Sequence, residues 1–284
     1  MYDNHNHSNC LISIIERGKE KLSKANISNA HKEIEWFLQS KLSIPLHSIK
    51  TNQSYKLNNT KIKLFSKFIN RRITGEPFQY IIKQAPFYGY DFIVNSDTLI
   101  PRPESETIIR VAKKYGKFNQ ALDLGTGTGN LAITLSLQKI AKNIDAIDIS
   151  SKALKVANRN KKKHKTLNVH FFKKDIFHLR AKKGYDLIIS NPPYISQREY
   201  LKLDQHILDY EPQISLTDNN EGLDFYKFFS KNLIKNLNPK GKIILEIGYK
   251  KNHKTIKNLF VKNNFKHKWH KDLNGDNRVI ELYQ

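Results

Sequence analysis

The pattern of apolar residues changes character along the chain. Over the first 85 residues, apolar side chains recur at intervals of three and four, which predicts amphipathic helices. Three such stripes are Leu11, Ile14, Ile15 and Leu22; Ile34, Phe37, Leu38 and Leu42; and Ile62, Phe65, Phe68 and Ile69. We expect these stripes to be the core of a small helical domain over residues 1–85, since core packing explains them more simply than a binding face does.

Residues 86–106 form a connector with turn and strand character. Gly89, between two short aromatic runs, predicts a hairpin, and Pro101-Arg102-Pro103 predicts an extended rather than helical path. From residue 107 onward, short apolar runs alternate with helical patterns, which is typical of a parallel sheet. The sequence therefore predicts an α/β domain over residues 107–284. Its expected strands are 120–124, 143–148, 168–172, 185–190 and 242–247, followed by a strand-turn-strand tail around Asn274-Gly275-Asp276.

Size and composition fit such a two-domain protein. The 284 residues suffice for one large α/β domain and a small one, and the single cysteine, Cys10, excludes an intrachain disulfide. The N-terminus lacks the apolar segment of a secretory signal, and no apolar run is long enough for a transmembrane helix. We expect a cytoplasmic protein that does not contact a membrane. His5 and His7 resemble a metal-binding pair only superficially, so we expect no metal site.

The formal net charge of +23 raises the question of nucleic-acid binding. However, 40 of the 49 basic residues are lysine, whereas arginine is the usual residue for bidentate phosphate recognition. A solvated lysine-rich surface explains the charge more simply. Steering of an acidic protein or a ribosome-associated partner is the alternative.

A glycine-rich loop follows the first predicted strand and precedes a helix. Alternating glycines allow the backbone to turn tightly and to approach a ligand closely. The spacing GxGxG differs from the dinucleotide pattern GxGxxG, and no Gly-Lys-Ser/Thr follows, which excludes a P-loop. The candidate cofactor-binding residues of this loop are Gly125, Thr126, Gly127, Thr128 and Gly129.

Two acidic residues lie at or near the ends of the next two predicted strands. Asp148 stands where a carboxylate accepts both ribose hydroxyls of a nucleoside; the alternative is a capping role for the following helix, which Ser150 or Ser151 could fill instead. Asp175, next to Ile176 and Phe177, is a candidate for holding an adenine amino group. A structural role in an exposed loop explains Asp175 equally well.

The tetrapeptide Asn191-Pro192-Pro193-Tyr194 ends the apolar run 185–190. Two prolines stiffen the chain at the carboxyl edge of the predicted sheet, where ligands bind in open α/β folds. The Asn191 side chain and the Pro192 carbonyl can accept the two hydrogens of a planar –NH2 group, while the Tyr194 ring covers one face. We therefore assign catalysis to Asn191 and Pro192 and substrate binding to the whole tetrapeptide, and we count Asn191 among the cofactor-binding residues as well. A turn-forming role for Asn191 is the alternative.

Taken together, these spacings resemble the S-adenosylmethionine-dependent methyltransferases of the Rossmann-like class. The resemblance implies a seven-stranded sheet with an antiparallel last strand, and S-adenosyl-L-methionine as cofactor. A nicotinamide dehydrogenase would explain the glycine loop, but it has no role for the Asn-Pro-Pro-Tyr tetrapeptide.

Further motifs from residue 75 to the C-terminus resemble the PrmC/HemK family. They are Gly75-Glu76-Pro77-Phe78-Gln79-Tyr80-Ile81, Phe87-Tyr88-Gly89, Leu99-Ile100-Pro101-Arg102-Pro103-Glu104-Ser105-Glu106, Glu211-Pro212, Gly222-Leu223-Asp224-Phe225-Tyr226 and Glu246-Ile247-Gly248. The resemblance implies a protein-(glutamine-N5) methyltransferase that acts on the Gly-Gly-Gln motif of class-1 peptide chain release factors. It also implies that the N-terminal domain docks the release factor.

Within this resemblance, the glycine loop contacts the methionine part of the cofactor, Asp148 the ribose, and residues 191–194 the substrate glutamine. Ile176 departs from the pattern, because some members have a tryptophan beside the adenine there. The missing aromatic stacking is worth roughly 0.5–1.5 kcal/mol. Ser105 stands where threonine is common.

Two other functions remain open at this point. A methyltransferase of adenine or another nucleic-acid base would explain the charge and the tetrapeptide, and a non-catalytic binding module would keep the fold. Intact Gly125, Gly127, Gly129, Asp148 and Asn191 argue against the binding module. We expect a monomer whose partner is a release factor rather than a nucleic acid.

Overall fold

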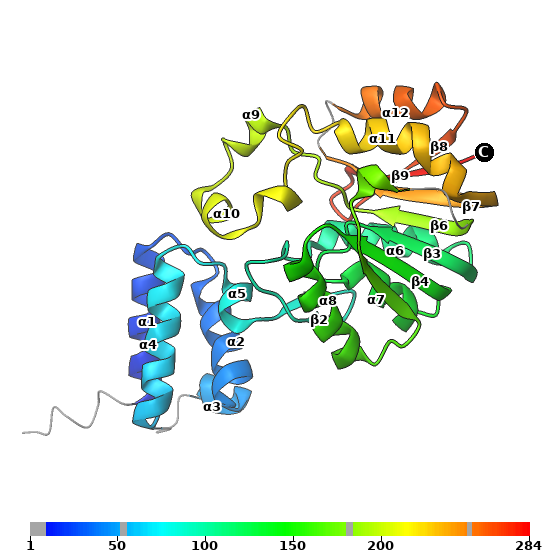
Figure 1. Cartoon of the computed structure of the whole chain (residues 1–284). Coiled ribbons are helices and arrows are strands. Elements are labelled where there is room, and N and C mark those ends of the chain that lie inside the picture. Colours follow the sequence, from blue (N-terminus) through cyan, green and yellow to red (C-terminus); the bar gives the residue numbers. More distant parts are fainter. Residues whose placement is uncertain (1–9, 52–55, 180–183, 249–251) are drawn as a thin grey trace, which may run out of the picture. The chain divides into compact units, whose positions relative to one another are not determined.

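The computed structural model describes residues 10–51, 56–179, 184–248 and 252–284, and the chain divides into two compact units, Met1–Lys83 and Gln84–Gln284. Figure 1 shows the helical first unit and the sheet-containing second unit. Among the helices of the described residues, none has the length and apolar character needed to cross a membrane.

The first unit consists of helices packed around one apolar core. Its elements are α1 (Leu11–Lys24), α2 (Ala30–Leu42), α3 (Leu46–Thr51), α4 (Asn59–Ile73) and α5 (Phe78–Ile82). The apolar stripes predicted from the sequence are confirmed as this core, with Ile62 at its edge. Stacked rings of Phe37 and Phe68, whose centroids are 4.3 Å apart, join α2 to α4.

A short hairpin begins the second unit. Strands β1 (Ala85–Phe87) and β2 (Tyr90–Phe92) are antiparallel, and Tyr88 and Gly89 between them have φ angles of +52° and +78°. Positive φ at both turn positions is the geometry that matches the twist of paired strands, so the predicted hairpin is confirmed.

The predicted extended path through Pro101-Arg102-Pro103 is only partly correct. Arg102 is extended, with φ −100° and ψ 141°, but Pro103 opens the 3-10 turn η1 (Pro103–Ser105). Proline suits the first position of a helix, because its fixed φ fits there and its missing N–H would be unpaired anyway. Helix α6 (Glu106–Lys113) follows directly.

The centre of the second unit is a seven-stranded sheet with the order β5-β4-β3-β6-β7-β9-β8. Strands β3 to β7 pair in parallel with one another, and β9, the last strand, is antiparallel to both of its neighbours. The predicted α/β fold with an antiparallel last strand is therefore confirmed. The strands are β3 (Phe118–Leu124), β4 (Ala141–Asp148), β5 (Val169–Lys173), β6 (Tyr185–Ser190), β7 (Leu237–Glu246), β8 (Lys266–Lys271) and β9 (Asn277–Tyr283).

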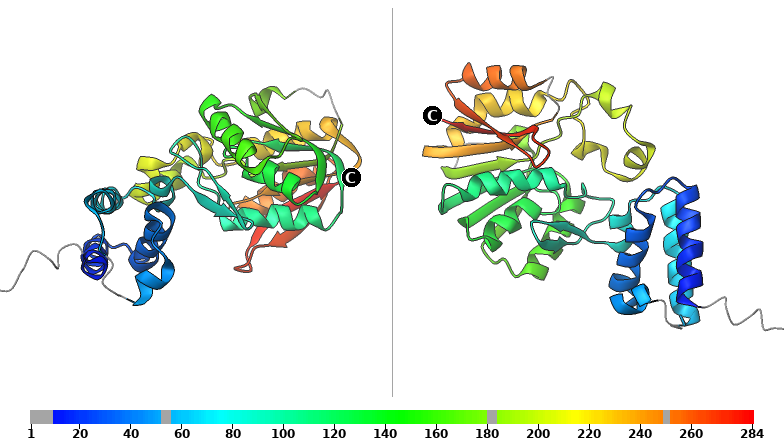
Figure 2. Two further views of the ribbon diagram at one scale, coloured as in Figure 1. Left: turned by 90° about the horizontal axis from the view of Figure 1, so that it is seen from below. Right: turned by 180° about the vertical axis from the view of Figure 1, so that it is seen from behind.

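Helices cover both faces of this sheet (Figures 1 and 2). Successive residues of a strand point to opposite faces, and β6 shows this directly. Leu187 and Ile189 pack with α6 and α7, whereas Ile188 packs with α11 and α12. The longer helices of this unit are α7 (Asn130–Leu137), α8 (Ser151–His164), α11 (Asp224–Asn232) and α12 (His253–Val261).

Strand β7 begins at Leu237, five residues before the predicted start at 242. Its pairing with β6 steps from Tyr185↔Leu237 to Leu187↔Lys242, so the residues between Leu237 and Lys242 form a bulge. The predicted start is late because the bulge contains Pro239 and Gly241, and proline and glycine within a strand are found mainly at bulges and edges.

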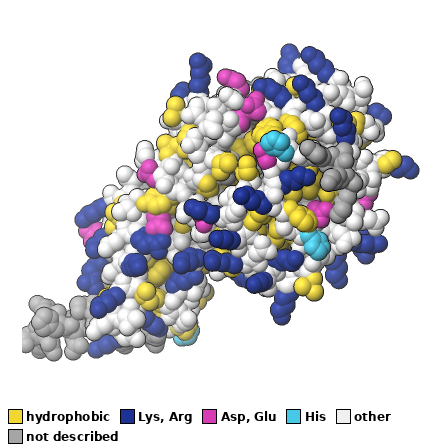
Figure 3. Space-filling view, in the orientation of Figure 1, with side chains coloured by type: hydrophobic (Ala, Val, Ile, Leu, Met, Phe, Trp, Pro, Cys, Tyr) yellow, Lys and Arg dark blue, Asp and Glu magenta, His cyan; other side chains and the backbone are white. Residues whose placement is uncertain are grey.

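The connection from β6 to β7 is long and contains the short helices α9 (Gln197–Tyr200) and α10 (Gln205–Tyr210). Three 3-10 turns complete the unit: η2 (Ile176–His178), η3 (Gln213–Ser215) and η4 (Leu233–Asn236). In the space-filling view, Lys and Arg side chains are scattered over the visible surface of this unit, with apolar and uncharged side chains between them (Figure 3).

Candidate active site

A cavity of about 320 Å³ lies within the second unit at the carboxyl ends of β3, β4 and β6. This is the edge at which open α/β sheets bind ligands, and the volume is in the range of small-molecule sites. The predicted residues that line it are Gly125, Gly127, Asp148, Asp175, Asn191 and Pro193. The fold thus brings residues from three separate sequence motifs to one cavity.

The glycine loop after β3 is held by backbone and side-chain bonds. The N–H groups of Gly125 and Thr126 donate to the Ile147 carbonyl at 2.9 and 3.0 Å, and the Thr126 hydroxyl donates to the buried Asp123 at 2.6 Å. Gly127 has a φ of +54°, and no atom lies within 4 Å of the position that a Cβ would occupy. Gly127 therefore leaves room for a ligand against its backbone. Thr126 and Thr128 are buried, so their side chains stabilise the loop.

Asp148 ends β4 and faces the same cavity. Its Oδ2 accepts the Gly127 N–H at 2.9 Å and its Oδ1 accepts the Ser150 N–H at 2.8 Å. Burial raises the pKa of the Asp148 carboxyl, and these backbone donors oppose the rise. Each oxygen keeps a second acceptor site, which fits a pair of ribose hydroxyls. The capping role at α8 is filled by Ser150, whose hydroxyl accepts the Ala153 N–H at 3.1 Å.

Asp175 has a structural role that the sequence left open. Its carboxylate accepts the Phe177 N–H at 2.9 Å and contacts the His178 ring at 3.0 Å, and so caps the short turn η2. It also lines the cavity, next to Ile176 and Phe177. The apolar wall continues into α11, because the rings of Phe177 and Phe225 lie 4.9 Å apart. A planar base fits against this wall.

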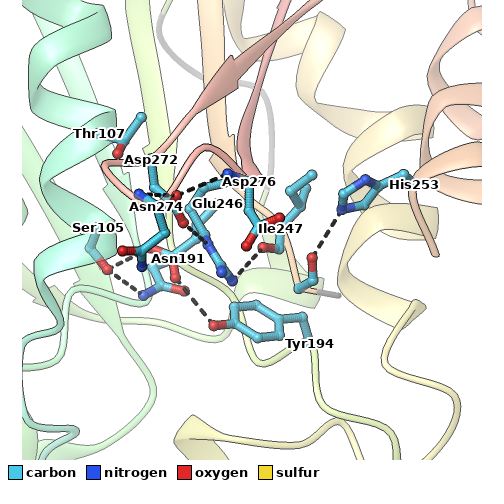
Figure 4. Close-up of polar contacts among 12 residues, drawn as sticks. Ser105, Thr107, Asn191, Tyr194, Glu246, Ile247, His253, Asp272, Asn274 and Asp276 are labelled. Carbon is cyan, nitrogen blue, oxygen red and sulfur yellow. Dashed lines mark hydrogen bonds and ion pairs between the residues drawn. The ribbon is translucent and has the colours of Figure 1, made fainter. Parts of the chain in front are cut away.

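Asn191 stands directly after β6, at the corner formed by residues 191–194. Its side-chain nitrogen donates to the Ser105 hydroxyl at 3.0 Å (Figure 4). This bond uses the nitrogen end of the amide and leaves the oxygen, Oδ1, as an acceptor for a ligand. Pro193 also lines the cavity, whereas Pro192 is buried.

Tyr194 is directed to the wall of the site. Its hydroxyl donates to Glu246 Oε1 at 3.2 Å, and its ring packs on Gly248 so closely that a Cβ there would lie 2.6 Å from the ring. The predicted contact of this ring with the substrate remains a prediction.

Glu246 is a residue that reasoning from the sequence missed, apart from its place in a family motif. It ends β7, is 1% exposed, and accepts the Ser105 hydroxyl at Oε2 at 2.5 Å. Burial raises its pKa to about 7. A carboxylate at the end of the buried run 243–245 was the available signal, since acids are rarely buried without a partner.

The connection after β6 packs closely on the Asn191 corner. A Cβ at Gly222 would lie 2.2 Å from the Tyr194 carbonyl oxygen, and Gly222 has a φ of +73°, so glycine is required there. Asp218 holds this turn by accepting the N–H groups of Gly222 and Asp224 at 2.9 and 3.0 Å. The motif that begins at Gly222 therefore packs against the corner formed by residues 191–194 and supports it.

Arg102 and Glu106 brace the second unit. Arg102 pairs with the buried carboxylate of Glu211, and Glu106 accepts the Tyr88 N–H at 2.8 Å, which ties α6 to the hairpin. Among the described residues, no group of three or more His, Cys, Asp or Glu side chains could hold a metal ion. His5 and His7 lie outside the described residues.

Two family models match the chain. The model described as "Methyltransferase small domain" matches residues 104–214, and that described as "PrmC N-terminal domain" matches residues 13–82. Among solved structures, a methyltransferase from Pyrococcus furiosus is 20% identical with a TM-score of 0.54, and the match covers 77% of this chain and 98% of that one. This likeness supports the fold.

Curated relatives are similar over most of the chain. A release factor glutamine methyltransferase from Geobacter sulfurreducens is 31% identical, with 95% of each chain covered. That from Bacillus subtilis is 38% identical over 76% of this chain and 78% of its own. A bifunctional methyltransferase from Rickettsia felis is 31% identical over 95% of this chain, which spans only 57% of that longer protein. These matches show that the chain belongs to the release factor glutamine methyltransferase family.

Proposed function

We propose that this protein transfers a methyl group from S-adenosyl-L-methionine to the side-chain amide nitrogen of the glutamine in the Gly-Gly-Gln motif of class-1 peptide chain release factors. The observation that carries the proposal is that Asn191 lines the same cavity as Gly127 and Asp148. An acceptor for an amide N–H group and a nucleoside-binding edge therefore share one space.

The residues of the cavity fit the cofactor. Asp148 offers carboxylate oxygens for ribose hydroxyls, Ile176 and Phe177 offer an apolar wall for adenine, and Gly127 leaves space at the loop for the methionine part. S-adenosyl-L-methionine, when bound, supplies an electrophilic methyl group on a positively charged sulfur.

The difficulty of the reaction lies in the nucleophile, because an amide nitrogen shares its lone pair with the carbonyl. Asn191 Oδ1 and the Pro192 carbonyl accept the two N–H hydrogens of the glutamine amide, and so fix its plane and position. Orientation of this kind supplies ~7–11 kcal/mol when the geometry is close to that of attack. As the nitrogen gains positive charge, its N–H groups become better donors, so the same acceptors bind the transition state more tightly than the ground state. The proton then leaves to water.

We further propose that the helical first unit docks the release factor. Support comes from the family model over residues 13–82 and from the names of the relatives from Bacillus subtilis and Geobacter sulfurreducens. In this proposal the protein acts as a monomer in the cytoplasm, and its lysine-rich surface plays no part in recognising nucleic acid.

A labelling experiment tests the proposed function. The protein is incubated with methyl-labelled S-adenosyl-L-methionine and offered a class-1 release factor, the same factor with its motif glutamine changed to alanine, RNA or DNA. We expect label on the intact release factor alone, because only that substrate presents the glutamine amide. Label on RNA or DNA would instead support a methyltransferase of nucleic-acid bases. The absence of label on every substrate would contradict both the glutamine methyltransferase and the base methyltransferase.

A further inference from the structure

A continuous chain of hydrogen bonds leads from Asn191 into the core. The Asn191 amide nitrogen donates to Ser105 Oγ at 3.0 Å, and the Ser105 hydroxyl donates to Glu246 Oε2 at 2.5 Å. The Tyr194 hydroxyl donates to the other carboxylate oxygen at 3.2 Å. Figure 4 shows these side chains converging from η1, from the corner after β6 and from the end of β7.

The number of hydrogens on each group determines which group donates in each of these hydrogen bonds. A serine hydroxyl has one hydrogen, and here that hydrogen is donated to the Glu246 carboxylate. Ser105 can therefore only accept a bond from Asn191, and the Asn191 amide must turn its –NH2 group toward Ser105. The amide oxygen is then the end offered to a ligand.

We propose that Glu246, acting through the Ser105 hydroxyl, fixes the orientation of the Asn191 amide so that its oxygen rather than its nitrogen is presented to the substrate. The inference rests on the proposed function, in which this oxygen accepts an N–H of the glutamine amide. Glu246 and Ser105 are thus positioning residues, and Asn191 is the residue that touches the substrate.

The surroundings of Glu246 make this orientation depend on pH. The carboxylate is surrounded by Glu104 and Ser105 from the η1 turn, Tyr194 from the corner, Tyr226 from α11 and Arg278 from β9. The Tyr226 hydroxyl donates to the Glu246 backbone carbonyl at 2.7 Å. The Arg278 side chain pairs with Asp272.

Burial beside this carboxylate raises the pKa values of Tyr194 and Tyr226, so both phenols stay neutral near pH 7, and Arg278 stays charged. Glu246, with a pKa of about 7, is ionised above that pH and protonated below it. A protonated Glu246 can donate to Ser105, which frees the serine hydrogen for the Asn191 oxygen and turns the amide the wrong way. The turnover rate is therefore expected to rise with pH through about 7.

The variants that test this are Ser105→Ala, Ser105→Thr, Glu246→Gln and the double variant Ser105→Ala/Glu246→Gln. Ser136→Ala is the matched control, because its hydroxyl also bonds an asparagine side chain, that of Asn168, but away from the cavity. Initial rates with the release factor give kcat across pH, calorimetry gives the Kd of S-adenosyl-L-methionine, and thermal melting checks folding.

We expect Ser105→Ala and Glu246→Gln each to lower kcat about tenfold, the fold-change that corresponds to a 1.4 kcal/mol cost of orienting the amide. The cofactor Kd stays unchanged. Both residues act on Asn191 through the same series of hydrogen bonds. The kcat of the double variant is therefore expected to match that of the slower single variant within about twofold, rather than to show the product of the two losses. Ser105→Thr keeps a hydroxyl and is expected to keep most of the wild-type kcat. Glu246→Gln is expected to lack the rise of kcat with pH near 7.

A substrate-free measurement separates this inference from the proposed function. The side-chain amide signal of Asn191 in an NMR spectrum, identified by its loss in Asn191→Ala, reports the bond to Ser105 directly. We expect protection from solvent exchange in the wild-type protein above pH 7, and loss of protection in Ser105→Ala and in the wild-type protein below pH 7.

Two results overturn the inference whether or not a release factor is methylated. One is an Asn191 amide signal that is identical in the wild-type protein and Ser105→Ala. The other is a multiplicative loss of kcat in the double variant. Failure of the proposed function would instead show as absence of label on the release factor while the NMR signal behaves as expected.

Discussion

Replacing Asn191 by alanine is expected to lower kcat/KM for methylation of the release factor about 10²–10³-fold, the range found when one preorganised hydrogen-bonding group is removed from an active site. The physical reason is that the amide oxygen binds the glutamine –NH2 group more tightly as positive charge develops on its nitrogen. Rates of label transfer at varied release-factor concentration provide the measurement.

Asn263→Ala is a matched control, because within the described part of the chain the Asn263 side chain bonds the Leu259 carbonyl on α12 and does not line the cavity. It is expected to keep wild-type kinetics and the wild-type Kd of S-adenosyl-L-methionine. Turnover by Asn191→Ala equal to that of this control would show that the corner does not hold the reacting amide.

Replacing Asp148 by alanine is expected to raise the Kd of S-adenosyl-L-methionine about 100-fold. Hydrogen bonds to a charged group contribute about 1.5–3 kcal/mol each, and the carboxylate is positioned to accept two ribose hydroxyls. The variant also loses the bond from the Gly127 N–H, which loosens the glycine loop beside the cofactor. Calorimetric titration with S-adenosyl-L-methionine measures the effect.

Asp209→Ala serves as the control for this variant, because Asp209 lies on α10 and its carboxylate, among the residues that the structure describes, accepts a bond from the exposed Gln205 side chain outside the cavity. Its Kd is expected to equal that of the wild-type protein. A Kd for Asp148→Ala within about threefold of this control would show that the carboxylate does not bind the ribose.

Much of the fold could be predicted because buried strands consist mainly of apolar residues. The run 185–190 is buried except for the half-buried Asp186, and its predicted bounds agree with β6. The starts of β3 and β4 were placed two residues late, because their first residues include exposed polar side chains that carry no apolar signal. The start of β7 was hidden by its bulge.

The part of the candidate site that lies at the ends of adjacent strands could be predicted from the sequence. Gly127 and Asn191 follow β3 and β6, and Asp148 ends β4. These three strands are adjacent in the sheet, so alternation of strands and helices was enough to bring the three residues together. The support of Asn191 could not be predicted, because Ser105 and Glu246 are 141 positions apart in sequence. Only the folded chain shows that one hydroxyl joins them.

The most direct test of the account is a crystal structure of the protein with S-adenosylhomocysteine and a release-factor peptide that contains Gly-Gly-Gln. We predict that the glutamine side-chain nitrogen lies within hydrogen-bonding distance of Asn191 Oδ1, about 2.7–3.2 Å, in the cavity that Gly127 and Asp148 also line. A glutamine amide bound out of reach of Asn191, or facing the Asn191 nitrogen, would contradict the account.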